Sequence, residues 1–186
     1  MHANAVIARR AIGAMFFSVF GCAWLMVWAF HRFPQQTIAF ILVGLVFLVL
    51  FYFCFQCYLG NRSALADESN DPVRMRTNRM FNIINAIQWV AIFLIINVLN
   101  RNGLADWAVP AIILLIGLHF IPLAKIFKYP PHYLTGAGLI IVSIGYPLLA
   151  LNGPRDFVGC LVTGLILWAS ALRVIIAQRH NLARKS

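Results

Sequence analysis

The feature that most constrains this chain is a series of six apolar runs, each about twenty residues long. A hydrocarbon core about 30 Å thick is crossed by about 20 helical residues, so each run is long enough to span a bilayer. In hydrocarbon every backbone N–H and C=O needs a partner within the protein, which leaves helices or a closed β-barrel. The runs lack the period-two alternation of barrel strands. The sequence therefore predicts an all-α integral membrane protein.

Composition excludes a water-soluble globule. Apolar residues make up 62% of the chain and charged residues 11%, against about 45–50% and about 25% in soluble domains. So many apolar side chains cannot all be hidden from water in a chain of 20.9 kDa. The lipid bilayer is therefore the expected partner, and we expect a single six-helix transmembrane domain over residues 1–186.

The expected transmembrane helices pair into three antiparallel hairpins, each closed by a short turn. Their ranges are residues 11–30, 37–59, 80–99, 107–124, 133–151 and 157–177. The first run follows Arg9 and Arg10, as in a signal peptide, but it is too long and lacks a small-residue cleavage site, so we expect an uncleaved span. The one long connection, residues 60–79, is expected to be a cytoplasmic loop.

The basic residues decide the expected orientation. With six spans, both termini and the second-to-third and fourth-to-fifth connections lie on one side of the membrane. That side holds twelve basic residues: Arg9, Arg10, Arg62, Arg74, Arg76, Arg79, Lys125, Lys128, Arg173, Arg179, Arg184 and Lys185. The other side holds three, Arg32, Arg101 and Arg155. Since cytoplasmic loops carry the excess of Lys and Arg, both termini are expected in the cytoplasm.

The layout of three hairpins is similar to that of small bacterial six-span stress-associated membrane proteins, with no shared motif. Because no motif is shared, the resemblance implies nothing about function. The expected location is a bacterial cytoplasmic (inner) membrane. The net charge of +10 does not indicate nucleic-acid binding. Its basic residues stand at the ends of apolar runs, where topology requires them, and not along a stripe with interleaved aromatic residues.

The third span is the most polar, with Asn82, Asn85, Gln88 and Asn97 inside it. A carboxamide that faces lipid costs a few kcal/mol, so this side of the helix is expected to face other helices or a wet cavity. Two interpretations stay open. The side chains line a pathway or ligand surface, or they form structural hydrogen bonds between helices.

His119 is the only histidine deep in an apolar run, one turn before Pro122. Proline lacks an N–H, and therefore the carbonyl of Leu118 loses its usual helical bond and remains as a polar acceptor. His119 is interpreted either as a ligand-contacting or proton-responsive side chain near Asn82 and Asn85, or as a neutral imidazole bonded to another helix.

Basic residues gather on the expected cytoplasmic face and are candidates for binding anionic lipid headgroups. They are Arg74, Arg76, Arg79, Lys125, Lys128 and Arg173. The topology rule alone also predicts such a cluster. For Arg173, inside the last turns of the sixth span, extension of the side chain towards the headgroups is sufficient explanation.

Glycine marks the second helix of each hairpin, where a Gly-Leu pair begins at Gly44, Gly117 and Gly164. Three hairpin repeats would fit a duplicated membrane protein, but leucine-rich helices match short patterns by coincidence. The fifth span carries Gly136 and Gly145, and small residues allow helices to approach closely.

No catalytic group is recognised, and we expect neither an enzyme nor a metal or cofactor. All five carboxylates lie in loops or at span ends, and neither an HExxH nor a GxSxG motif occurs. Cys54 and Cys57 have CxxC spacing, but on a helix with no further ligands, so packing is the preferred interpretation.

Three functions remain, in order of preference. The first is a transporter or channel-like protein that passes a small, uncharged or weakly charged solute along the polar third helix near His119. Because the chain is small, it would require a homodimer. The second is a non-enzymatic protein that binds lipid or supports a partner complex. The third is a membrane-embedded enzyme acting on a lipidic substrate.

Overall fold

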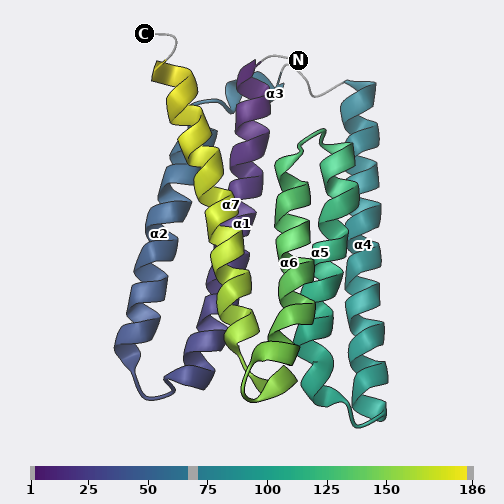
Figure 1. The fold of residues 1–186 in the computed structure, drawn as a ribbon. Coiled ribbons are helices and arrows are strands. Elements are labelled where there is room, and N and C mark those ends of the chain that lie inside the picture. Colours follow the sequence, from purple (N-terminus) through teal and green to yellow (C-terminus); the bar gives the residue numbers. More distant parts are fainter. Residues whose placement is uncertain (1–2, 67–70, 184–186) are drawn as a thin grey trace. The chain divides into compact units, whose positions relative to one another are not determined.

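The structure is a computed structural model that describes residues 3–66 and 71–183, with side chains at 4–65 and 71–177. Its long helices are α1 (Ala3–Arg32), α2 (Thr37–Leu59), α4 (Pro72–Arg101), α5 (Ala108–Ile126), α6 (Pro131–Leu149) and α7 (Val158–Ala183). Short elements connect them: α3 (Ser63–Ala66) and the 3₁₀ turns η1 (Ala105–Trp107) and η2 (Gly153–Arg155). Within the described residues, six helices are long and apolar enough to cross a membrane, and they pack as adjacent antiparallel pairs (Figure 1). The predicted all-α, six-span integral membrane protein is confirmed.

The contacts between helices divide the chain into two units. Unit 1 comprises residues 1–71 and 164–186, and unit 2 comprises residues 72–163. Unit 1 therefore holds α1, α2, α3 and most of α7, while unit 2 holds α4, α5, α6 and the first residues of α7. Unit 2 is continuous in sequence, whereas unit 1 is assembled from two distant segments.

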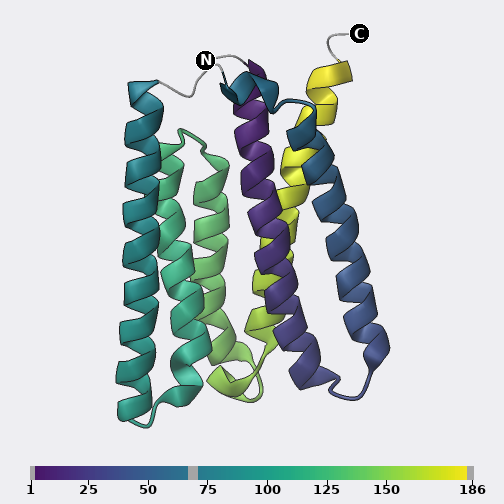
Figure 2. The same cartoon turned by 180° about the vertical axis from the view of Figure 1, so that it is seen from behind.

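In unit 1, α1 and α2 form a hairpin that is visible from both sides (Figures 1 and 2). The close contact between α1 and α7 is made by two glycines. A Cβ added to Gly21 would lie 3.1 Å from the carbonyl oxygen of Gly164, and one added to Gly164 would lie 2.9 Å from that of Gly21. The indole of Trp168 covers this contact and donates a hydrogen bond of 3.0 Å to the carbonyl oxygen of Ser18. The backbones can approach because neither glycine has a side chain.

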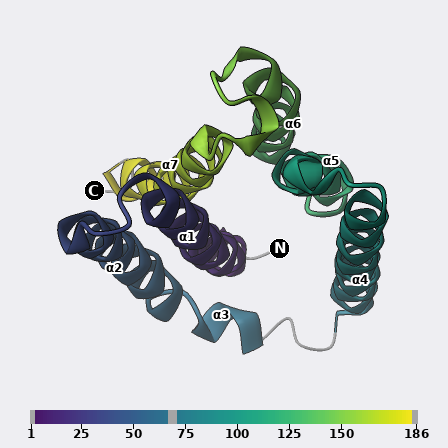
Figure 3. The same ribbon diagram turned by 90° about the horizontal axis from the view of Figure 1, so that it is seen from below.

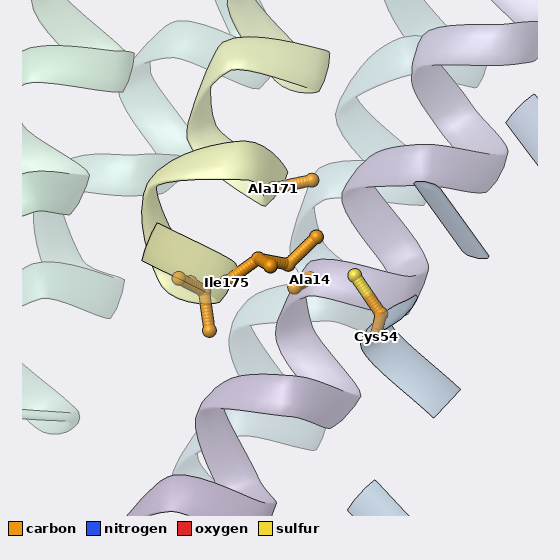
Figure 4. Packing of buried hydrophobic residues seen from close by; sticks show 5 residues of the cluster. Ala14, Cys54, Ala171 and Ile175 are labelled. Atoms are coloured by element: carbon orange, nitrogen blue, oxygen red, sulfur yellow. The ribbon is translucent and has the colours of Figure 1, made fainter. Parts of the chain in front are cut away.

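A small apolar core joins all three long helices of unit 1. It consists of Ala14 from α1, Cys54 from α2, and Ala171, Val174 and Ile175 from α7 (Figure 4). Cys54 is 1% exposed, and its thiol is free. Its place among apolar side chains supports packing as its role.

In unit 2, α5 lies between α4 and α6 (Figure 3). The contact between α5 and α6 again depends on a glycine pair. A Cβ on Gly117 would lie 3.0 Å from the carbonyl oxygen of Gly136, and one on Gly136 would lie 2.8 Å from that of Gly117. The side chains of Phe120 and Ile140 fill the space on either side of the pair.

Helix α4 is longer than the span predicted for it. It begins at Pro72 and not at Met80, so residues 72–79 of the expected loop are helical, as are Ser63–Ala66 in α3. Proline suits the first turn of a helix because its missing N–H would have no helical partner there. The 30 residues of α4 extend over about 45 Å at 1.5 Å per residue. This exceeds a hydrocarbon core of about 30 Å, so the first turns of α4 extend beyond it.

Some of the charged residues considered above cannot be placed. Asp67 and Glu68 from the expected loop, and Arg184 and Lys185 from the C-terminal segment, lie outside the described residues, as does the side chain of Arg179. Arg179, Arg184 and Lys185 are three of the twelve basic residues that predict the orientation.

An ion pair joins the two 3₁₀ turns of unit 2. The Nε atom of Arg155 in η2 donates to the Oδ2 atom of Asp106 in η1 over 2.7 Å. The side chains are 75% and 44% exposed, respectively, so the pair contributes at most about 1 kcal/mol. Next to it, the Oδ1 atom of Asp156 accepts the backbone N–H of Val158 and satisfies a donor at the start of α7.

Candidate functional site

Only two of the four carboxamides of α4, those of Asn85 and Gln88, lie on the side of the helix that packs against α5, and Asn97 lies on the opposite side. Asn85 and Gln88 are half-buried, whereas Asn82 and Asn97 are exposed. Asn97 donates from Nδ2 to the carbonyl oxygen of Phe93 in its own helix, over 2.7 Å. Among the described residues it is the one member of this set with a side-chain hydrogen bond. Among the described residues of unit 2, none of these four side chains forms a hydrogen bond to another helix.

His119 lies in the second half of α5, and its Nδ1 atom is buried without a hydrogen-bond partner among the described residues. A buried polar atom without a partner carries a desolvation cost of about 1–3 kcal/mol. Such atoms are uncommon in folded proteins, and one explanation is a water molecule or ligand that binds there. His119 is thus a stronger candidate for ligand contact than its position in the sequence alone indicated.

His132, in the first turn of α6, is a neighbour of His119 that was not among the candidates from the sequence. The rings of His119 and His132 both contact the ring of Phe120, with centroid separations of 6.0 and 5.7 Å. The His132 ring also contacts those of Phe127 and Tyr129, with centroid separations of 6.2 and 5.0 Å. Its position after Pro130 and Pro131 indicated only a turn. The packing of α6 against α5 brings His132 close to His119.

Two buried hydroxyls add to the polar atoms of unit 2. Tyr146, near the end of α6, has its ring against Gly159, where an added Cβ would meet ring atoms at 2.4–2.7 Å. Its Oη atom and the Oγ1 atom of Thr163 are buried without a hydrogen-bond partner among the described residues. Neither residue was a sequence candidate. A tyrosine followed by Pro147 within a span was the available signal, since proline weakens the local hydrogen-bond ladder.

These polar atoms are spread along the length of unit 2. His132 and Tyr146 are separated by 14 positions on α6, or about 21 Å along the helix axis. His119 lies near the first of them, on the adjacent helix. This separation covers about two thirds of a hydrocarbon core of about 30 Å. Polar groups therefore occur near both ends of the bundle, in addition to the half-buried carboxamides in the middle of α4.

The basic candidates fall into two groups. Arg74, Arg76 and Arg79 lie in the first turns of α4, and Lys125 and Lys128 lie at the end of α5. Antiparallel packing brings these two ends together, as the contact between the rings of Phe81 and Phe127 shows, with a centroid separation of 5.7 Å. Arg173, in contrast, belongs to unit 1.

Lys128 has an unusual backbone conformation. Its φ angle is +48°, in the left-handed region that glycine normally occupies after a helix. The N–H of Tyr129 donates to the carbonyl oxygen of Ala124 over 3.0 Å, which closes the end of α5 around this residue. For a residue with a Cβ, the left-handed conformation costs about 1–2 kcal/mol.

Within the described residues, no group of three or more His, Cys, Asp or Glu side chains is arranged to hold a metal ion. The chemistry that these residues offer is hydrogen bonding by carboxamides, hydroxyls and imidazoles, together with cationic contacts at one end of unit 2. No protein-family model, curated protein or solved structure matches this chain.

Proposed function

We propose that this six-span membrane protein is a transporter or channel-like protein for a small, uncharged polar solute, and that the solute passes along unit 2. The observation that supports the proposal most is the set of buried polar atoms that have no hydrogen-bond partner among the described residues, His119 Nδ1, Tyr146 Oη and Thr163 Oγ1. A membrane protein gains no stability from burying such atoms unpaired. Water or a polar solute would supply the missing hydrogen bonds.

The half-buried carboxamides of α4 extend this argument. Asn85 and Gln88 lie in the middle of the helix, far from either membrane surface. They carry no charge, and the described spans contain no carboxylate within their apolar middle segments. Coupled pumps usually place an ionisable carboxylate within the membrane. Passive movement of an uncharged solute therefore fits these side chains better than proton-coupled pumping.

Access of water to α4 tests this proposal. The natural cysteines are first replaced by alanine, and Asn85→Cys, Gln88→Cys and Ile87→Cys are then made separately. Ile87 is the matched control, because it lies at the same depth on the exposed side of the helix, where its side chain is 62% exposed. A thiol reacts as the thiolate, which forms only in contact with water.

We expect a hydrophilic, membrane-impermeant methanethiosulfonate to modify the cysteines at positions 85 and 88 at least about tenfold faster than the cysteine at position 87. Glycerol-driven swelling of proteoliposomes, followed by light scattering, should then be faster than in protein-free vesicles. Equal modification rates at the three positions would remove the basis of the proposal.

We also propose that both termini face the cytoplasm of a bacterial inner membrane. Support comes from the basic ends of α4 and α5, which extend to the same side of unit 2. In intact cells, a cysteine introduced by Asn102→Cys should react with an impermeant reagent, and one introduced by Lys128→Cys should react only after lysis. The reverse result would invert the orientation.

A further inference from the structure

We infer that Tyr146 and Thr163 together hold a single hydroxyl group, of a water molecule or of a small polyol, between α6 and the first turns of α7. These two side chains are called the hydroxyl pair. Where the held group belongs to a polyol, this rests on the proposed function and names the chemical class of the solute. Where it belongs to water, no transport is required.

The hydroxyl pair is buried and its polar atoms are unsatisfied. Tyr146 is 7% exposed and Thr163 is 0% exposed. Among the described residues, neither Tyr146 Oη nor Thr163 Oγ1 has a hydrogen-bond partner, so the two hydroxyls do not bond to each other either. Each of them can both donate and accept a hydrogen bond. A third group is therefore needed to satisfy them.

Thr163 differs from other hydroxyl side chains in the long helices. Five of these donate to a carbonyl oxygen three or four residues earlier in the same helix, over 2.7–3.3 Å, and they are Ser18, Thr77, Thr135, Ser143 and Ser170. Such a bond is the usual arrangement for a serine or threonine inside a helix. Thr163 makes no such bond. Its hydroxyl therefore remains available to a group outside α7.

Gly159 brings the ring of Tyr146 onto α7. A Cβ added to Gly159 would lie 2.7 Å from the Cζ atom of Tyr146, which carries the hydroxyl. Thr163 follows Gly159 by four residues and lies on the same side of α7. The side of the helix that meets the tyrosine ring is therefore also the side that carries the threonine hydroxyl, about one turn further along.

The direction of the tyrosine side chain brings the two hydroxyls towards each other. A long side chain in a helix points back towards the N-terminus of that helix. Because α6 and the first turns of α7 run antiparallel, this is the direction from Gly159 to Thr163 (Figure 1). A bridging hydroxyl group makes two hydrogen bonds of about 2.7–2.8 Å and so spans up to about 5.5 Å. That span matches one helical turn of about 5.4 Å.

The chemistry of the hydroxyl pair favours a small, neutral hydroxyl group as its ligand. Two side chains that each donate and accept are complementary to a group that does both. Neither side chain offers a charge that could compensate an ion within the membrane. The close contact of the Tyr146 ring with Gly159 favours a small ligand.

A double-mutant cycle in the full chain tests whether the two hydroxyls share one ligand. Tyr146→Phe, Thr163→Val and their combination remove the hydroxyls and keep the side-chain shapes. Ser143→Ala is the control, because Ser143 is also buried but its hydroxyl already bonds to Ile140 in its own helix. The readout is the unfolding equilibrium constant, from denaturant titration in detergent micelles without polyol.

Each single variant leaves the other hydroxyl and the held group with one bond fewer, so we expect the unfolding constant to rise about fivefold in each. The combination should also raise it by no more than about fivefold, whereas two independent sites would give about 25-fold. Ser143→Ala combined with Thr163→Val should be additive. Additivity of Tyr146→Phe with Thr163→Val, or no change in either single variant, would overturn the inference.

Glycerol-driven swelling of proteoliposomes distinguishes the two sources of the hydroxyl group. If a polyol is the ligand, Tyr146→Phe and Thr163→Val should each slow the swelling about fivefold, while Ser143→Ala swells like the wild type. Wild-type swelling in both variants, with the coupling intact, would assign the hydroxyl pair to water. A wild-type protein that does not speed the swelling would refute the proposed function, and the coupling alone would then decide the inference.

Discussion

The two units share one kind of helix contact and differ in the hydrogen bonding of the polar atoms inside them. Each brings two helices together over a glycine pair, Gly21 with Gly164 in unit 1 and Gly117 with Gly136 in unit 2. In unit 1 the neighbouring indole N–H of Trp168 has an acceptor. In unit 2 several buried polar atoms have none among the described residues. Close packing of helices therefore does not require that every buried polar atom be hydrogen-bonded, and we assign the solute to unit 2, which holds His119 Nδ1, Tyr146 Oη and Thr163 Oγ1.

The largest effect is expected from Gly117→Ala in unit 2. The new Cβ would meet the side chain of Ile140 at 2.8 Å and two backbone atoms, of Gly136 and Ile140, at 3.0 Å, and the backbone cannot rotate away. We expect a loss of about 2 kcal/mol in the free energy of unfolding, measured by denaturant titration in detergent micelles. Gly145→Ala is the control, because an added Cβ meets nothing within 4 Å there. It should be neutral or stabilising by up to about 1 kcal/mol, and an equal loss at both positions would refute the glycine contact.

A smaller loss is expected from Gly21→Ala in unit 1. Here the added Cβ meets only one backbone atom, the carbonyl oxygen of Gly164 at 3.1 Å, and the nearest atom, 2.3 Å away, belongs to the side chain of Trp168, which can move. The indole would leave its hydrogen bond to Ser18, and we expect a cost of about 1 kcal/mol. Gly13→Ala on the same helix, where an added Cβ meets nothing within 4 Å, is the matched variant. A larger cost at Gly21 than at Gly117 would reverse the ranking of the two contacts.

Removing only the indole N–H of Trp168 should lower the free energy of unfolding by less than either glycine substitution. Trp168→Phe keeps a ring over Gly21 and deletes the N–H that bonds to Ser18. Hydrogen bonds between membrane helices contribute about 0.6 kcal/mol on average, and a loss of this size is expected in the same titration. Trp107→Phe, at an exposed position in η1, should lower the stability by less. No difference between the two would mean that the indole acts through its shape alone.

The smallest effect on stability is expected from His119→Leu. This variant tests directly whether a buried polar atom of unit 2 differs from the hydrogen-bonded indole of unit 1. Because Nδ1 of His119 has no partner among the described residues, an apolar side chain of similar size should leave the unfolding free energy unchanged or raise it slightly. Glycerol flux in proteoliposomes should nevertheless fall. A clear loss of stability would show that the imidazole has a structural partner, and unit 2 would then resemble unit 1.

Much of the fold could be predicted from the sequence, because its cause is local. The length of each apolar run fixes a span, and so the number of spans and their antiparallel order follow from hydropathy. The start of α4 at Pro72 was not predicted, since polar residues in an exposed first turn resemble a loop. Residues 72–79 are helical although they are too polar to belong to an apolar run.

The contacts between helices could not be predicted, because a run that is apolar on all sides does not show which side meets which neighbour. The Gly-Leu pattern illustrates this limit. Gly117 and Gly164 lie at close helix contacts, whereas an added Cβ on Gly44 would meet only the terminal methyl of Met26, at 3.9 Å. For the candidate site, the polar character of α4 was visible, but the proximity of His119 to His132 depends on how α5 and α6 pack.

The division of α7 between the units has a consequence for how the protein is made. Residues 72–163 complete unit 2 as one continuous stretch, whereas unit 1 needs Gly164–Ala183 to pack against helices synthesised long before. At translation rates of about 5–20 residues per second, the α1–α2 hairpin waits in the membrane for about 5–20 s. During that time Gly21 has no α7 to contact. A nascent chain that ends at Thr163 should therefore contain a protease-resistant unit 2, together with an α1–α2 hairpin that other membrane helices can still bind.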